Sequence, residues 1–139
     1  MNRSQILLTL AIIVVFPIFF GGIWSGVCYL IGALGGWQNL ASKYETPKDT
    51  VVDQKFTSEY GKFGVSRYKF TLTVGFSKSG IFFANNPFFR IGHPPMLIPW
   101  SAIKIVSTDG LFLHIKADDS DIWLSKKFLV NIQPYASKP

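Results

Sequence analysis

The stretch that decides the fold is ILLTLAIIVVFPIFFGGIWSGVCYLIGALGGW, residues 6–37 of a chain of 139 residues. No charged side chain occurs between Arg3 and Lys43, which bracket it. A bilayer has a hydrocarbon core about 30 Å thick, and about 20 apolar residues in a helix cross it, because a helix satisfies its own backbone hydrogen bonds without water. The sequence therefore predicts an N-terminal transmembrane anchor over residues 1–37.

Two other interpretations of this stretch fit less well. A cleaved signal peptide has an apolar run of about 7–15 residues and a small-residue cleavage site, whereas here the hydrophobic pattern resumes at Tyr29. A hairpin of two spans, turning near Pro17 or Gly21-Gly22, would have halves about 22 Å long, which is too short to cross. We therefore expect one span, with a kink at Pro17.

The rest of the chain has the size of one small domain. We expect a juxtamembrane helix and linker over residues 38–52, with the helix stopped by Pro47, and a domain over residues 53–139. The chain has 14 Lys and Arg against 8 Asp and Glu, and every positive side chain except Arg3 follows the span. Such a domain is attracted to anionic lipid headgroups, whereas its positive charges are too scattered to favour nucleic acid.

The flanking charges predict the orientation of the anchor. Lys43, Lys48 and Lys55 follow the span closely and outnumber Arg3. By the positive-inside rule, we expect an inner-membrane protein with its C-terminal domain on the cytoplasmic side. Trp24, Tyr29 and Trp37 are placed to mark the second membrane interface, where tryptophan and tyrosine are enriched.

Two G-x-x-x-G matches occur in the apolar stretch, Gly22 to Gly26 and Gly32 to Gly36. Small residues four apart let helix backbones approach closely in lipid, so these glycines are candidate helix–helix contacts and a homo-oligomer is one expectation. A glycine-rich apolar segment also produces this spacing by chance. The single cysteine, Cys28, is either an acylation site or, more commonly for a cysteine within an apolar helix, a small buried hydrophobe.

Apolar residues recur with period two in the second half of the chain. Tyr68, Phe70, Leu72 and Val74 share one face of a strand predicted over 67–74, and a turn over 75–80 leads to a partner strand over 81–84. Further short strands are predicted over 96–98, 102–106, 111–116 and 122–124, and Ser125 can cap a helix over 126–131. The sequence therefore predicts a membrane-anchored α+β protein: one transmembrane helix, then a small mainly antiparallel roll or partly open barrel with a short C-terminal helix.

Three segments of the chain carry a resemblance to known proteins. The segments 73–82 and 89–103, including GHPPMLIPW at 92–100, and the element GWQNLASKY at 36–44 resemble a group of uncharacterised bacterial single-pass membrane proteins. That family has no established activity, so the resemblance implies architecture and brings no catalytic residues. The IPWSAI run at 98–103 is also similar to strands of bacterial pleckstrin-homology-like domains, which implies a bent sheet and a closing helix.

No pattern in the sequence predicts catalysis. His93 and His114 are the only histidines, and neither has metal-ligand spacing with Cys28 or a carboxylate. We expect no metal, no cofactor and no enzymatic activity, with an enzyme that lacks a recognisable motif as the alternative. His93 is interpreted as a turn residue held by Pro94-Pro95, His114 as a polar-face strand residue, and the acidic run 118–121 as a solvated turn.

The loop over residues 85–95 is the most unusual feature outside the anchor. It carries Phe88, Phe89 and Ile91, although loops are normally polar. The rule that large apolar clusters are buried favours a lid over the small core. The alternative is a contact with lipid headgroups or a membrane partner, with Arg90 pairing to a phosphate. We therefore expect a binding or scaffolding module at the membrane surface, or else a small accessory subunit of a membrane complex.

Overall fold

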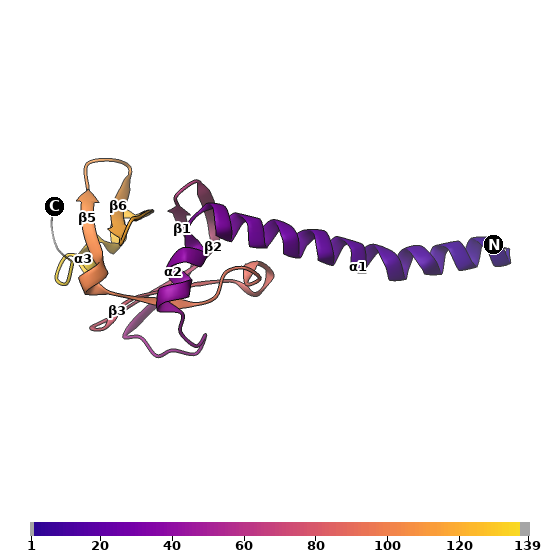
Figure 1. The fold of residues 1–139 in the computed structure, drawn as a ribbon, viewed down its shortest axis with the longest axis horizontal. Helices are drawn as coiled ribbons and strands as arrows, with labels where there is room; N and C mark the ends of the chain where they lie inside the picture. The colour runs from indigo at the N-terminus through magenta and orange to yellow at the C-terminus, as the bar shows by residue number, and fades with distance from the viewer. Residues whose placement is uncertain (1, 137–139) are drawn as a thin grey trace.

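The computed structural model describes residues 2–136, which form one long helix followed by a β domain (Figure 1). Helix α1 (Arg3–Leu34) begins at a capping box, in which the Asn2 side chain accepts a hydrogen bond from the backbone N–H of Gln5. It runs through Pro17 without interruption. Within residues 2–136, α1 is the one helix long and apolar enough to cross a membrane. A single apolar N-terminal helix, rather than a hairpin of two, is thus confirmed.

A tight turn separates α1 from α2 (Trp37–Tyr44). Gly36 begins α2 with a φ of 83°, a left-handed conformation that glycine adopts without steric cost. The helix predicted to begin at residue 38 is therefore present and starts one residue early. Its side chains at Trp37, Leu40 and Ala41 are buried against the β domain, because positions i, i+3 and i+4 share one face of a helix.

Seven strands form one antiparallel sheet with the order β4-β3-β2-β1-β7-β6-β5. Their bounds are β1 Gln54–Phe63, β2 Ser66–Ser77, β3 Gly80–Asn85, β4 Met96–Pro99, β5 Ile103–Ser107, β6 Phe112–Ala117 and β7 Ser120–Ser125. The two edge strands, β4 and β5, are consecutive and joined by the short 3-10 helix η2 (Trp100–Ala102), so the sheet bends into a nearly closed barrel. The predicted antiparallel domain is confirmed.

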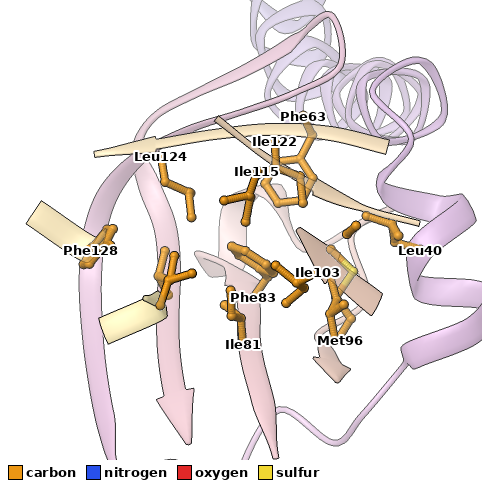
Figure 2. Close-up of a cluster of buried hydrophobic side chains, with 14 of the residues drawn as sticks. Leu40, Phe63, Ile81, Phe83, Met96, Ile103, Ile115, Ile122, Leu124 and Phe128 are labelled. Atoms are coloured by element: carbon orange, nitrogen blue, oxygen red, sulfur yellow. The ribbon is translucent and has the colours of Figure 1, made fainter. Parts of the chain in front are cut away.

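The barrel interior holds the hydrophobic core. Figure 2 shows side chains from several strands, among them Phe63, Ile81 and Phe83, pointing into one interior. After β7, the Ser125 hydroxyl accepts from the backbone N–H of Lys127 and starts η3 (Lys126–Phe128), which continues into α3 (Leu129–Ile132). Phe128 and Ile132 from this C-terminal turn join the core. The predicted short C-terminal helix, with its serine cap, is confirmed.

Two features of the sheet differ from the prediction. No strand was predicted over β1, although β1 lies at the centre of the sheet. Ser58 has a φ of 56° where the register between β1 and β2 shifts, so period two does not run through the strand. Phe70 was predicted on the buried face, but it has a φ of 59° and is 72% exposed. A second register shift, between Glu59 and Gly61, accounts for this, because β2 accommodates extra residues there.

Candidate functional site

The loop of residues 86–95, hereafter the docking loop, lies against the last turns of α1. Figure 1 shows it extending from the end of β3 alongside the helix. It opens with the 3-10 helix η1 (Pro87–Phe89), which is capped by Asn86: the side-chain oxygen accepts from the backbone N–H groups of Phe88 and Phe89. This cap turns the chain away from the barrel and towards α1.

Two side chains of α1 hold one carbonyl of the docking loop. The indole N–H of Trp24 donates to the carbonyl oxygen of Phe88 at 2.7 Å, and the Cys28 sulfur lies 3.7 Å from the same oxygen. The rings of Trp24 and Phe89 pack with centroids 5.2 Å apart. Cys28 is fully buried by this contact. Of its two interpretations, the structure therefore favours the small buried hydrophobe over the acylation site.

Glycines let the backbones of α1 and the domain touch. A Cβ added at Gly32 would lie 2.4 Å from the carbonyl oxygen of Gly92, and one at Gly92 would lie 2.5 Å from the Cα of Tyr29. Gly92 also has a φ of 73°. On another side of the helix end, a Cβ at Gly35 would lie 2.6 Å from the carbonyl oxygen of Phe63 in β1. No other residue type fits these positions without moving a backbone.

The structure places the two G-x-x-x-G pairs in different environments. Gly32 packs on the docking loop and Gly36 forms the turn before α2, so this pair is used within the chain. A Cβ at Gly22 or Gly26 would meet nothing within 4 Å. At about 100° per residue, these two glycines lie on the side of α1 that faces away from Cys28 and the loop. Gly22 and Gly26 therefore stay open for a contact with another helix.

A buried histidine fixes the second half of the docking loop. His93 Nε2 lies 2.7 Å from the Tyr68 hydroxyl, and Nδ1 lies 3.0 Å from the carbonyl oxygen of Ile91. Because a carbonyl can only accept, Nδ1 carries the proton and the tyrosine donates to Nε2. Burial lowers the pKa of His93 and raises the pKa of Tyr68. The Trp37 indole N–H donates to the carbonyl oxygen of Pro94 at 2.9 Å. His93 is thus a neutral link between the loop and β2.

The apolar residues of the loop do not form a lid. Phe88 is 75% exposed, Ile91 is 47% exposed and Arg90 is exposed, while Phe89 is partly buried against Trp24. None of the four belongs to the core cluster. The lid interpretation is therefore wrong, because η1 directs the loop onto α1 and the C-terminal turn packs on the core instead. Phe88 and Phe89 line a shallow apolar groove together with Phe20 and Trp24.

The other polar candidates lie on the barrel away from the docking loop. His114 Nε2 is 2.9 Å from a carboxylate oxygen of Asp121, and its ring stacks on Trp123. In the acidic turn, Asp118 accepts from the Tyr44 hydroxyl at 2.8 Å. Within residues 2–136, no group of three or more His, Cys, Asp and Glu side chains could hold a metal ion.

Comparison of the chain with models of known protein families, with curated proteins and with solved structures gives no match.

Proposed function

We propose that this chain is a single-pass inner-membrane protein whose β domain is held at a fixed height on the cytoplasmic surface as a binding or scaffolding module. One observation carries the proposal: the docking loop contacts α1 from Trp24 onward. From Arg3 to Trp24 the helix rises about 32 Å. That length matches the hydrocarbon core of about 30 Å. The part of α1 that the domain leaves uncovered therefore suffices to cross the bilayer.

The residues around Trp24 suit a membrane interface. Tryptophan is enriched at that level, and Phe88 and Ile91 expose apolar surface beside it. Arg90 in the loop and Arg67 at the start of β2 are exposed and positively charged. Each such charge near an anionic membrane contributes about 1 kcal/mol of attraction. Apolar side chains that enter the interface and cations that meet lipid phosphates support membrane contact, the alternative to the lid.

The rigid junction supports a scaffolding role. A flexible linker would let the domain take many orientations, whereas here hydrogen bonds and glycine contacts fix the docking loop to α1. A partner would then meet the barrel surface at one height above the membrane. The positive-inside rule, applied to Lys43, Lys48 and Lys55 against Arg3, supports the cytoplasmic orientation.

Depth measurements on the full chain in lipid nanodiscs test this proposal. Cys28→Ala removes the native thiol, and nitroxide labels are then placed singly with Phe16→Cys, Phe88→Cys or Leu111→Cys. Oxygen and nickel accessibility should place the Phe16 label near the bilayer centre, the Phe88 label at the interface and the Leu111 label in water. A Phe88 label as accessible to nickel as the Leu111 label would overturn the proposal. A reporter fused to the carboxyl terminus should be active in the cytoplasm, and an exported reporter would reverse the orientation.

A second candidate function is that of a small accessory subunit in a membrane complex. The observation that favours it is the open face of α1 at Gly22 and Gly26. Small residues on a lipid-facing helix let another helix approach closely. Stoichiometric co-purification of another membrane protein that is lost on Gly22→Ile with Gly26→Ile would favour this function, which is compatible with the proposed depth.

A further inference from the structure

A pocket of about 380 Å³ lies where α1, α2 and the docking loop meet. Its volume is within the range of small-molecule sites. Tyr29 of α1 lines one side, and Gly92 and Pro94 of the docking loop line another. Ser42 of α2 and Glu45 at the end of that helix complete the wall. Two consecutive helices and a loop that lies far along the chain thus build one concavity.

Hydrogen bonds hold the walls of this pocket in place. The Gln38 side-chain amide donates to the carbonyl oxygens of Tyr29 at 3.0 Å and of Gly92 at 3.3 Å, and so joins α1 to the docking loop. The backbone of Glu45 forms an isolated antiparallel bridge with Met96, the first residue of β4. The pocket is therefore preformed in the folded chain.

The pocket combines a carboxylate with an aromatic residue. Glu45 is exposed, and across residues 2–136 no lysine, arginine or histidine forms an ion pair with it. The neighbouring Lys43 lies 3.6 Å from Asp118 instead. Tyr29 is 59% exposed. An aromatic face attracts a cation through its quadrupole, and a carboxylate attracts it through its charge. This pairing fits an ammonium group and disfavours an anion.

The height of the pocket indicates where such an ammonium group comes from. Tyr29 lies five residues beyond Trp24, which is about 7.5 Å along the helix axis. The headgroup layer extends about 5–7.5 Å beyond the hydrocarbon core on each side. With Trp24 at the edge of the hydrocarbon, as in the proposed function on which this step rests, the outer edge of the headgroup layer lies at the height of Tyr29.

We propose that this pocket binds the primary ammonium group of a phosphoethanolamine headgroup carried by a membrane phospholipid. The Glu45 carboxylate accepts hydrogen bonds from the ammonium group, and the Tyr29 ring packs against it. The lipid chains extend along α1 into the bilayer. A bound lipid then contacts both the helix and the docking loop, and adds to the fixed position of the domain.

Native mass spectrometry of the full chain in detergent tests this site. The probes are phosphatidylethanolamine, phosphatidylcholine and phosphatidylglycerol in equal amounts. The wild-type chain should retain phosphatidylethanolamine about tenfold over the other two, and Glu45→Gln should abolish the preference. Asp119→Asn removes one exposed carboxylate outside the pocket and should leave the preference unchanged. If Glu45→Gln keeps the same preference for phosphatidylethanolamine as the wild-type chain, the proposed site is wrong.

Two further measurements test whether the ligand is a membrane lipid and whether the proposed depth of the domain is correct. Soluble O-phosphoethanolamine in large excess should not displace the bound lipid, because it lacks the acyl chains. Displacement by a stoichiometric amount would overturn the lipid as the source. A Phe88 label in water together with retained lipid preference would reject the proposed depth and leave the ammonium site standing. A Phe88 label at the interface without any preference would reject the ammonium site alone.

Discussion

The two parts of α1 have similar composition and opposite surroundings. The part from Arg3 to Ile23 packs against no strand of the barrel, and its large apolar side chains are exposed. The part from Trp24 to Leu34 is held by the docking loop, and Cys28 and Gly32 are buried within it. Both parts are apolar, and neither carries a charged side chain after Arg3. Composition therefore predicts the helix, whereas the position at which the domain meets the helix depends on a loop that lies far along the chain.

The largest loss of stability should come from adding a side chain at Gly92, where the backbones of the docking loop and α1 touch. Gly92→Ala places a Cβ against the Cα of Tyr29 and forces alanine into a left-handed conformation. We expect the free energy of unfolding of the full chain in detergent to fall by about 3 kcal/mol. Urea titration followed by tryptophan fluorescence measures this. Gly21→Ala, where an added Cβ meets nothing within 4 Å, is the matched control and should change little. Equal stability of the two variants would remove the distinction between the two parts of α1.

The next largest effect should be a loss of folding stability at low pH, through protonation of His93. Burial holds the pKa of His93 below its unfolded value of about 6.5, so the unfolded chain takes up a proton at a higher pH than the folded chain. The stabilisation is complete above that unfolded pKa and is lost as the pH falls from there towards the folded pKa. A protonated His93 would no longer accept from the Tyr68 hydroxyl.

Urea titrations between pH 8 and pH 5 measure this pH dependence. His93→Gln should reduce the dependence, since glutamine does not titrate. His114→Gln removes the histidine outside the junction and serves as the control. If the slope survives in His93→Gln, the acid-sensitive group lies elsewhere.

A smaller effect should separate the two phenylalanines of the docking loop. Phe89→Ser removes the packing on Trp24 and should cost about 1 kcal/mol of unfolding free energy. Phe88→Ser should leave that free energy nearly unchanged, because the Phe88 side chain is largely exposed. In nanodiscs, Phe88→Ser should instead make a label at Ile91→Cys more accessible to nickel. A large loss of stability in Phe88→Ser would contradict the exposed position of the Phe88 side chain.

Regular local patterns made parts of the barrel predictable. Leu111, Leu113 and Ile115 alternate with Phe112, His114 and Lys116, which predicts the strand β6. Leu113 and Ile115 are fully buried, whereas Leu111 precedes the strand and is 88% exposed. Strand β1 was missed because a bulge at Ser58 breaks its alternation. Phe70 was misplaced for the same physical reason, since a register shift changes which face a side chain occupies.

The contact between α1 and the docking loop was harder to predict, because it joins segments that are distant in sequence. Trp24 and Phe88 are 64 residues apart, and no local period links them. His93 was interpreted as a turn residue, and its glycine and proline neighbours do indicate a constrained loop. Its partner Tyr68, however, is set by the position of β2. The sequence marks the loop as unusual through its large apolar residues, but the helix that the loop contacts is revealed only by the fold.

The smallest effect on folding should come from the open glycine pair. Gly22→Ile with Gly26→Ile adds bulk where nothing lies within 4 Å, so the free energy of unfolding should change by less than about 0.5 kcal/mol. Gly32→Ile, which drives a side chain into the carbonyl of Gly92, is the contrasting variant and should be strongly destabilised. In lipid, the double variant also tests the predicted self-association, because close approach of two helices needs small residues at the contact. Energy transfer between labelled chains in vesicles should fall relative to wild type. Unchanged transfer would leave this pair as a chance spacing, and the only G-x-x-x-G glycines with a structural role would be Gly32 and Gly36.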